Sequence, residues 1–391
     1  MVPVDMAMAK AATHHLSMAQ QGLLQIREIS WRHTNNLPTP SATAPATECT
    51  TTTSTCWAGH TTSLNNSSRK NKLAIMNLIN ICSKATAFIC LLAIAHNTAA
   101  WGQTKAQAIK PTITDMAYGS HERQKLDFFK ATSDHPTPLM VFIHGGGWLN
   151  GDKQTYARKN HKNLSTILLN KGISAAFINY RLSTDAILPA PVIDAARAIQ
   201  FLRAKASELN IDPKRIAAAG QSAGGCTSLW LATHDDLAQP NSDDPIARQS
   251  TRLCGAWVTS AQTTIEPASI RKWIGEFGLK HHMICKAAGF KNNKDMDQNY
   301  ATKADLYREF SPINHLTADD PPMLLYYGSE LDKKSDGIHH AQHGLHFKNK
   351  ADQVKAKCYL KLPKHRDMFP NAPKLPTFFD EIFNSPQETS N

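Results

Sequence analysis

Two glycine-rich motifs stand in an order that suits attack by a serine on an acyl carbonyl. The first, HGGGW, runs from His144 to Trp148, and the second, GQSAGG, runs from Gly220 to Gly225. A serine hydroxyl alone is a poor nucleophile, and the tetrahedral intermediate that it forms carries a negative oxygen that N–H groups must stabilise. Together the motifs predict a serine hydrolase, in which one segment supplies the nucleophile and the other supplies hydrogen-bond donors.

The second motif has the G-x-S-x-G spacing of a nucleophile elbow, with Ser222 at its centre. Glycines at positions 220 and 224 permit the sharp strand-to-helix turn that exposes the serine hydroxyl. This turn also leaves the Ala223 N–H free to donate, and Gly146 and Gly147 offer further N–H groups on a backbone without side chains. We therefore predict that Ser222 is the nucleophile and that the amides of Gly146, Gly147 and Ala223 form the oxyanion hole.

Each motif follows a short apolar run that is typical of a buried strand. Residues 139–143 lead into the first motif, and residues 215–219 lead into the second. The other predicted strands are 112–129 (an antiparallel pair), 173–180, 253–259, 322–327 and 356–362, and the predicted helices are 157–171, 190–208, 223–233, 338–352 and 377–383. This alternation predicts a mostly parallel sheet with helices on both faces.

The chemistry also requires a histidine that accepts the serine proton and a carboxylate that orients the imidazole. With a nucleophile elbow, the usual chain order is serine, then the acid, then histidine. His365 follows the last predicted strand, so a loop could bring it over Ser222. The turn after the preceding strand offers Glu330 and Asp332, with Asp336 a few residues later, and we favour Asp332 as the acid.

Four histidines fall in the predicted helix 338–352, namely His339, His340, His343 and His346. Spacings of three and four place some of them on one face, as zinc ligands would be. No carboxylate or cysteine partner is fixed beside them, so we predict neither a metal nor another cofactor. Among other polar residues, His315 is expected to make a loop hydrogen bond, and Asp194 to be a helix-dipole partner or a structural hydrogen-bond acceptor.

The first hundred residues differ from the remainder. Residues 34–66 are dominated by Thr, Asn, Ser, Ala and Pro, a composition that predicts disorder. Lys84 precedes an apolar run of about eleven residues, and small residues follow at 98–100, which is the layout of a secretory signal peptide. A membrane anchor is the disfavoured alternative, because spanning a bilayer takes roughly 20 apolar residues.

A signal peptide normally lies at the very start of a chain. If translation began at Met76, the predicted signal peptide at about residues 76–100 would lie there. We therefore expect residues 1–75 to be a disordered extension or one that is not normally made. The mature protein would be exported to the periplasm or the medium. A secreted protein that still carried residues 1–75 would refute this start site.

The net charge of the chain is +11, and it falls to +7 without residues 1–100, which hold 7 basic and 3 acidic side chains. No basic block is interleaved with aromatic residues, so nucleic-acid binding is not predicted. The same cut leaves four cysteines, at positions 226, 254, 285 and 358, which allow three disulfide pairings between which the sequence does not choose.

The two motifs resemble those of the α/β-hydrolase esterases of the hormone-sensitive-lipase and carboxylesterase-like group. The resemblance covers about residues 112–385 and extends to Tyr180-Arg181-Leu182, to residues 191–194 and to residues 311–315. It implies carboxylic-ester hydrolysis through an acyl-enzyme, without a cofactor. Members of the group often place an aspartate three residues after the glycine of a G-x-x-D turn, where this chain has Leu331, with Asp332 next.

The expected fold class is therefore α/β, specifically an α/β-hydrolase catalytic domain at 101–391 with a cap inserted at about 262–318. The 391 residues suffice for one such large domain. Small or carbohydrate-linked esters are the expected substrates. We expect no stable insertion of the protein into a membrane. A peptidase or amidase of the same fold and a catalytically silent binding module are the alternatives.

Overall fold

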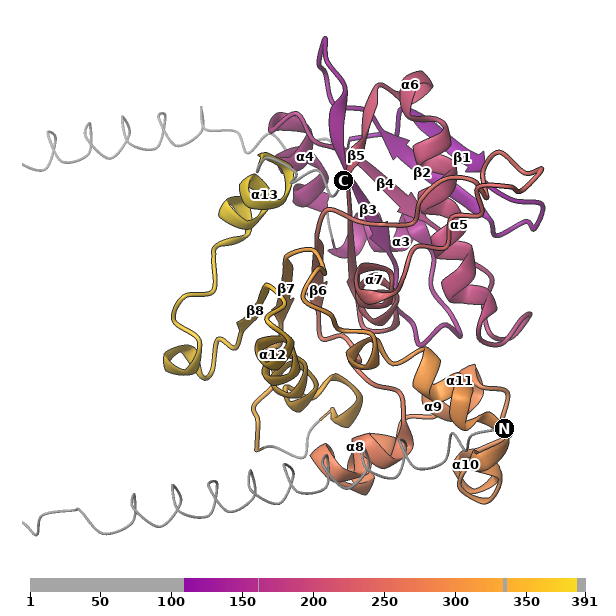
Figure 1. Cartoon of the computed structure of the whole chain (residues 1–391), viewed down its shortest axis with the longest axis vertical. Helices are drawn as coiled ribbons and strands as arrows, with labels where there is room; N and C mark the ends of the chain where they lie inside the picture. Colours follow the sequence, from indigo (N-terminus) through magenta and orange to yellow (C-terminus); the bar gives the residue numbers. More distant parts are fainter. Residues whose placement is uncertain (1–108, 161, 333–335, 385–391) are drawn as a thin grey trace, which may run out of the picture. The chain divides into compact units, whose positions relative to one another are not determined.

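A central sheet of eight strands organises the part of the chain that the computed structural model describes, which is residues 109–160, 162–332 and 336–384 (Figure 1). The predicted extension at 1–75 and the predicted signal peptide at 76–100 lie outside these residues. The strands are β1 (Ile113–Ala117), β2 (Lys125–Phe129), β3 (Thr137–Ile143), β4 (Ser174–Ile178), β5 (Ile211–Gln221), β6 (Ala256–Thr259), β7 (Met323–Tyr326) and β8 (Cys358–Lys361).

The strand order is β1-β2-β4-β3-β5-β6-β7-β8. The two pairs that involve β2 are antiparallel, and the pairs from β4 to β8 are parallel. The carboxyl ends of β3 and β5 therefore lie side by side, and these are the strands that lead into the two motifs. This topology confirms the predicted α/β-hydrolase class and the antiparallel pair at its edge.

The central strand β3 is apolar at residues 139–143 because both faces of the sheet are buried there. In β3, Leu139, Val141 and Ile143 point into one hydrophobic core, whereas Met140 and Phe142 point into the other. Such alternate placement is the normal consequence of the two-residue period of a strand. A strand that is buried on both faces has a continuous run of apolar residues, and this run is the pattern from which we predicted β3.

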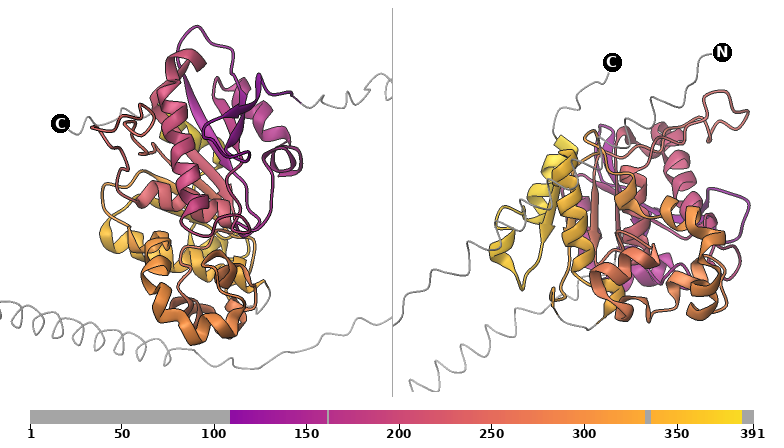
Figure 2. Two further views of the ribbon diagram at one scale, coloured as in Figure 1. Left: turned by 90° about the vertical axis from the view of Figure 1, so that its right-hand side faces the viewer. Right: turned by 60° about the horizontal axis from the view of Figure 1, so that its bottom comes forward.

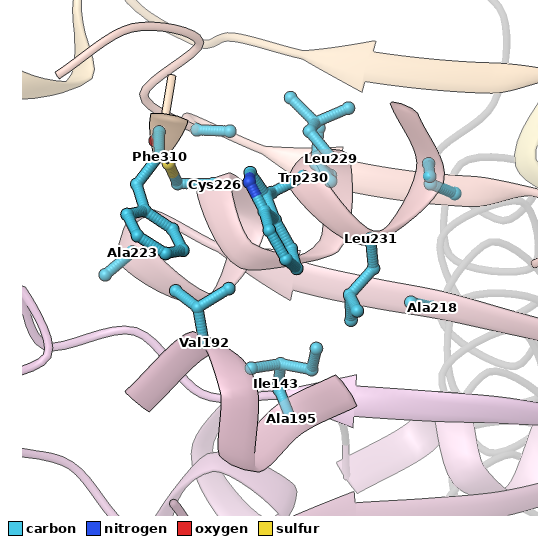
Figure 3. Close-up of a cluster of buried hydrophobic side chains, with 14 of the residues drawn as sticks. Ile143, Val192, Ala195, Ala218, Ala223, Cys226, Leu229, Trp230, Leu231 and Phe310 are labelled. Atoms are coloured by element: carbon cyan, nitrogen blue, oxygen red, sulfur yellow. Dashed lines mark hydrogen bonds between the residues drawn. The ribbon is translucent and has the colours of Figure 1, made fainter. Parts of the chain in front are cut away.

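Helices cover the two faces in separate layers (Figures 1 and 2). The first core takes side chains from α5 (Ala190–Ala204), α7 (Ala223–Thr233) and α12 (Gln342–Val354). The second takes side chains from α3 (Lys153–Asn160), α4 (Lys162–Asn170) and α13 (Leu375–Asn384). Figure 3 shows the first core around Trp230 of α7, which is 2% exposed and lies among side chains from β3, β5, α5 and the residue Phe310.

Two predicted helices are divided in the structure. The helix expected at 157–171 is α3 and α4, and it starts earlier because the Asp152 carboxylate caps it, accepting from the N–H groups of Gln154 (2.8 Å) and Thr155 (3.2 Å). The helix expected at 190–208 ends with α5, and α6 (Ala206–Leu209) follows. The predicted helix 223–233 coincides with α7.

The segment between β6 and β7 consists of short helices, drawn in orange in Figure 1. They are α8 (Pro267–Ile274), η1 (Glu276–Leu279), α9 (Met283–Ala287), α10 (Asn293–Asn299), η2 (Tyr300–Lys303), α11 (Ala304–Glu309) and η3 (Pro312–Asn314). Within the segment, the buried Tyr307 hydroxyl donates to the Ile284 carbonyl at 2.9 Å. That the segment between β6 and β7 acts as a cap stays a prediction.

Two further features of the described residues bear on the predictions. Cys226, Cys254, Cys285 and Cys358 are buried and free. The described helices include none that is both long enough and apolar enough to cross a bilayer.

Candidate active site

The elbow is formed where β5 passes into α7. Ser222 has φ 55° and ψ −126°, a backbone conformation that residues with side chains rarely adopt. Its N–H donates to the Thr259 carbonyl at 3.1 Å, and its own carbonyl accepts from the Cys226 N–H at 2.8 Å. These bonds hold the strained turn on both sides, so the serine side chain projects from a fixed point.

Close backbone approach explains the two flanking glycines. A Cβ on Gly220 would lie 2.3 Å from the carbonyl carbon and oxygen of Gly224, and a Cβ on Gly224 would lie 2.1 Å from the Ile143 oxygen. Main chain cannot move aside as a flexible side chain can, so both positions require glycine. The second contact presses the elbow against the end of β3, where the HGGGW motif begins.

The predicted donor loop follows β3 directly. Gly146 and Gly147 have φ values of 102° and 65°, in the region that favours glycine. Across from them, α7 begins at Ala223, whose N–H belongs to the first turn of an eleven-residue helix and lies at the positive end of its dipole. Gly146, Gly147 and Ser222 line one cavity. The oxyanion-hole role of the three amides stays a prediction.

Two aromatic residues brace the HGGGW loop. The Tyr180 hydroxyl donates to the His144 carbonyl at 2.8 Å, and the two rings stack with centroids 4.2 Å apart. Burial lowers the pKa of His144 to about 4, so this ring is a neutral packing element at pH 7. The Trp148 indole N–H donates to the Thr227 hydroxyl of α7 at 3.0 Å. The loop is thereby tied to the chain just after β4 and to the elbow helix α7.

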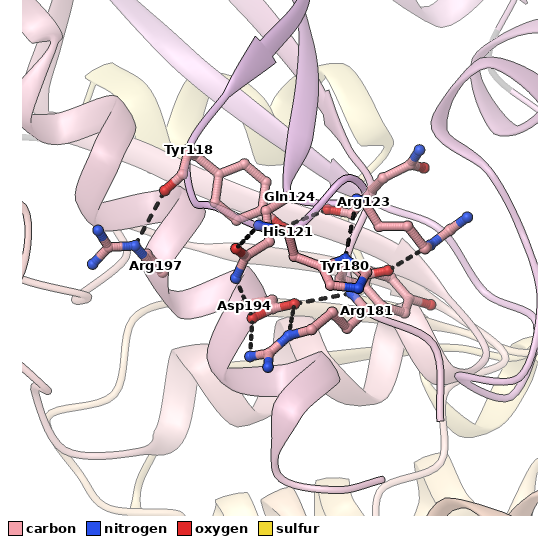
Figure 4. Close-up of polar contacts among 9 residues, drawn as sticks. Tyr118, His121, Arg123, Gln124, Tyr180, Arg181, Asp194 and Arg197 are labelled. Carbon is pink, nitrogen blue, oxygen red and sulfur yellow. Dashed lines mark hydrogen bonds and ion pairs between the residues drawn. The ribbon is translucent and has the colours of Figure 1, made fainter. Parts of the chain in front are cut away.

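A buried polar network lies behind Tyr180 (Figure 4). The Asp194 carboxylate accepts from the backbone N–H of Arg181 at 2.9 Å, from its guanidinium at 2.9 and 2.6 Å, and from the Gln124 amide at 2.7 Å. The Arg123 guanidinium donates to the Tyr180 carbonyl at 2.9 Å. Asp194 therefore acts as a structural acceptor, one of the two roles that we predicted for it.

The Ser222 hydroxyl is paired with a histidine that we did not predict as the base. The His339 Nε2 atom lies 2.8 Å from Ser222 Oγ, and the Asp336 carboxylate lies 2.8 and 2.9 Å from His339 Nδ1. A carboxylate can only accept, so the ring proton belongs on Nδ1, and the Nε2 lone pair is left to accept the serine proton. The arrangement is that of a nucleophile, a general base and an orienting acid.

Burial decreases outward along this chain of groups. Ser222 is 9% exposed, the His339 side chain is 29% exposed and that of Asp336 is 59% exposed. The acid therefore acts through a partly hydrated hydrogen bond, which solvent weakens relative to a buried one. Asp336 has φ 54° and directly precedes η4 (Gly337–His339), the single turn that presents the histidine.

Among the described residues, neither His365 nor Asp332, which we selected from the sequence, forms a hydrogen bond with Ser222 in the structure. The His365 ring accepts from the Leu331 N–H at 3.3 Å, and Asp332 is exposed. Glu330, the other alternative, forms an ion pair with Lys364 at 3.2 Å. The hydrogen bonds thus favour His339 as the base and Asp336 as the acid. The three-residue spacing of Asp336 and His339 was the available signal, but we considered that histidine only as a metal ligand.

The four clustered histidines have separate surroundings. Apart from His339, His343 is fully buried and its Nδ1 accepts from the Thr263 N–H at 3.4 Å, while His346 stacks on Trp273 with centroids 4.2 Å apart. Burial lowers the pKa of His343 to about 3, with smaller contributions from neighbouring histidine charges. The His343 ring is therefore a neutral packing element at pH 7, and burial also lowers the pKa of His346.

A cavity of about 530 Å³ opens over the serine. Residues of both motifs line it together with His339 of η4. From the segment between β6 and β7, His281, His282 and Met283 line it as well. Burial lowers the pKa of His281, assisted by the charges of His282 and His339. The walls are rich in hydrogen-bonding groups, and the volume suits a small ligand.

Known proteins match more than half of this chain. It is 27% identical over 260 residues to the Mycobacterium tuberculosis protein named "Probable carboxylic ester hydrolase LipM", covering 64% of this chain and 54% of that protein. It is 26% identical over 223 residues to esterase LipC of the same organism, covering 55% of this chain and 50% of LipC. The chain thus spans about half the length of these curated relatives.

A similar fold occurs in a solved structure, the acetyl ester-xyloside bifunctional hydrolase from Caldicellulosiruptor lactoaceticus. The TM-score is 0.51 and the identity 21%, with 66% of this chain and 87% of that chain covered. The BD-FAE family model matches residues 126–337, a stretch that includes both motifs and more than half of the 391 residues. The chain therefore belongs to the BD-FAE family.

Proposed function

We propose that this protein hydrolyses carboxylic esters through an acyl-enzyme formed on Ser222. The observation that carries the proposal is the continuous hydrogen bonding from Ser222 Oγ through His339 to Asp336, with contacts of 2.8 Å at each step. The family membership and the names of the curated relatives support the same activity.

The mechanism follows from the positions of these groups. His339 Nε2 takes the Ser222 proton while Oγ attacks the ester carbonyl, and Asp336 stabilises the resulting imidazolium. The amides of Gly146, Gly147 and Ala223 donate to the oxyanion. His339 then passes its proton to the departing alcohol, which leaves the acyl group on Ser222. A water molecule deprotonated by His339 releases the acid and restores the hydroxyl.

Small or carbohydrate-linked esters are the substrates that we propose. The cavity carries His281, His282, Asn150 and Gln221 on its walls, groups that suit an alcohol or acyl portion with several hydroxyls. The similarity in fold to an acetyl ester-xyloside hydrolase is compatible with this class of substrate. The cavity volume of about 530 Å³ is too small for a long acyl chain to lie entirely inside.

Hydrolysis of p-nitrophenyl acetate by wild-type protein and by Ser222→Ala tests the proposal. The variant should lose about a thousandfold or more in kcat, because no other group forms the acyl-enzyme. It should also lose labelling by a fluorophosphonate probe. Wild-type protein that neither turns over esters nor takes the label would refute the proposal and would favour a silent binding module. Cleavage of amides in preference to esters would favour the peptidase alternative.

Export remains a prediction that rests on residues 76–100. N-terminal sequencing of protein recovered from the periplasm or medium tests it. A mature start near Trp101 is expected, because the small residues before it suit a signal peptidase. Secreted protein that still contains residues 1–75 would contradict the predicted signal peptide.

A further inference from the structure

Two histidines and a glutamate from separate elements converge at the far end of α7. His234 follows the last residue of this helix, Glu309 ends α11, and His315 follows η3. Their ligand atoms all lie within 4.8 Å of one another. The His234 Nε2 atom is 3.0 Å from one carboxylate oxygen of Glu309, and His315 Nε2 is 4.0 Å from the other. Tetrahedral Zn²⁺ places such ligand atoms about 3.3–3.6 Å apart, so small rotations would suffice.

The hydrogen bonds of His234 require either a proton or a metal ion between this ring and Glu309. His234 Nδ1 lies 2.8 Å from the Asp235 carbonyl, which can only accept, so Nδ1 carries the ring proton. In a neutral ring, the Nε2 lone pair then faces a carboxylate oxygen at 3.0 Å. Two acceptors at this distance require a shared proton or a metal ion between them. An imidazole that gives its other N–H to a backbone carbonyl is also the usual arrangement of a metal-bound histidine.

The surroundings hold this cluster in place. Trp230, buried in the core, stacks on His234 with centroids 4.1 Å apart and donates its indole N–H to the Glu309 carbonyl at 2.9 Å. His315 Nε2 lies 2.6 Å from the same carbonyl, the loop hydrogen bond that we predicted. The side chains of His234, Glu309 and His315 are 19%, 42% and 20% exposed, so an ion could enter from solvent and keep a water ligand.

We propose that His234, Glu309 and His315 form a Zn²⁺ site that fastens the end of α7 to the α11–η3 segment. Binding replaces the hydrogen bond from His315 to the Glu309 carbonyl by a bond to the metal, and the proton of His315 Nε2 passes to solvent. The helix of eleven residues separates this site from Ser222 by about 16 Å. The ion therefore stabilises the fold and takes no part in the ester chemistry.

Calorimetric titration of Zn²⁺ into the full chain, prepared without a histidine tag and freed of metal with EDTA, tests this proposal. One ion per chain should bind and raise Tm. His315→Ala and Glu309→Gln should each weaken binding by more than about tenfold. His135→Ala, a matched control at an exposed histidine in another loop, should bind as wild-type protein does. Ester hydrolysis at a temperature well below Tm should be equal with and without Zn²⁺.

Co²⁺ bound to wild-type protein provides a readout that does not depend on variants. Intense visible absorption is expected, because a site of low coordination number with nitrogen and oxygen ligands relaxes the selection rules. Absence of these bands, no Zn²⁺ binding by wild-type protein, or equal affinities in the variants and the His135→Ala control would overturn the proposal. The cluster would then be an imidazolium–carboxylate pair only. Failure of ester hydrolysis would leave this result unaffected.

Discussion

Replacement of Asp194 by asparagine tests the buried network behind the HGGGW loop. The carboxylate is 1% exposed and accepts four hydrogen bonds, three of them from Arg181 and one from Gln124. Asparagine keeps one acceptor oxygen and places an NH₂ group against donors. Breaking a buried ion pair costs about 3–5 kcal/mol. Because the Arg181 side chain is 31% exposed and can turn toward water, we expect the lower end, about 3 kcal/mol.

The free energy of unfolding measured in urea at pH 7 checks this value. Asp212→Asn is the matched control, since Asp212 pairs with Arg215 at 2.7 Å but the two side chains are 27% and 29% exposed. Ion pairs in which both side chains reach solvent contribute about 0–1 kcal/mol, so the control should change little. Equal losses in the two variants would refute the argument that burial gives the Asp194 network its importance.

Three further predictions concern the loop, the elbow and pH. Tyr180→Phe removes the donor to the His144 carbonyl, so it should destabilise the fold by about 1–3 kcal/mol in urea and lower kcat more than it changes KM; unchanged stability and kcat would contradict the bracing role. Gly224→Ala places a Cβ 2.1 Å from the Ile143 oxygen, so ester hydrolysis should fall at least tenfold, and wild-type rates would refute the steric argument. Burial raises the pKa of Asp320 to about 6, above its unfolded value near 4, so its contribution to stability is present below pH 4 and is lost as the pH rises through 6. Asp320→Asn, which resembles the protonated acid, should remove that part of the pH dependence, by on the order of 2 kcal/mol between pH 4 and 8 in urea titrations; an unaltered pH profile would contradict the raised pKa.

The sequence predicted those features that depend on local pattern. The run Leu139–Ile143 is apolar at every position because β3 is buried on both faces, and this identified a central strand without any tertiary information. Ser222 was found in the same way, since the glycines around it are required by backbone contacts within the elbow and with the end of β3. The start of α3 was missed because the capping role of Asp152 was overlooked.

The base could not be chosen by pattern, because its position depends on how a loop folds. His365 follows the last strand as expected, yet its ring accepts from the N–H of Leu331 at 3.3 Å. The single turn at residues 337–339 instead carries His339 to the serine. The contact between Glu309 and His234 at the end of α7 could not be predicted either, because the two residues lie far apart in the sequence.

The assignment of His339 as the base is tested most directly by comparing kcat/KM on p-nitrophenyl acetate for His339→Ala and His365→Ala. We predict that His339→Ala lowers kcat/KM by about a thousandfold, because Ser222 then has no proton acceptor, while His365→Ala keeps most of the activity. The reverse result, an inactive His365→Ala and a nearly normal His339→Ala, would contradict this account. It would restore His365 and Asp332 as the residues that activate Ser222.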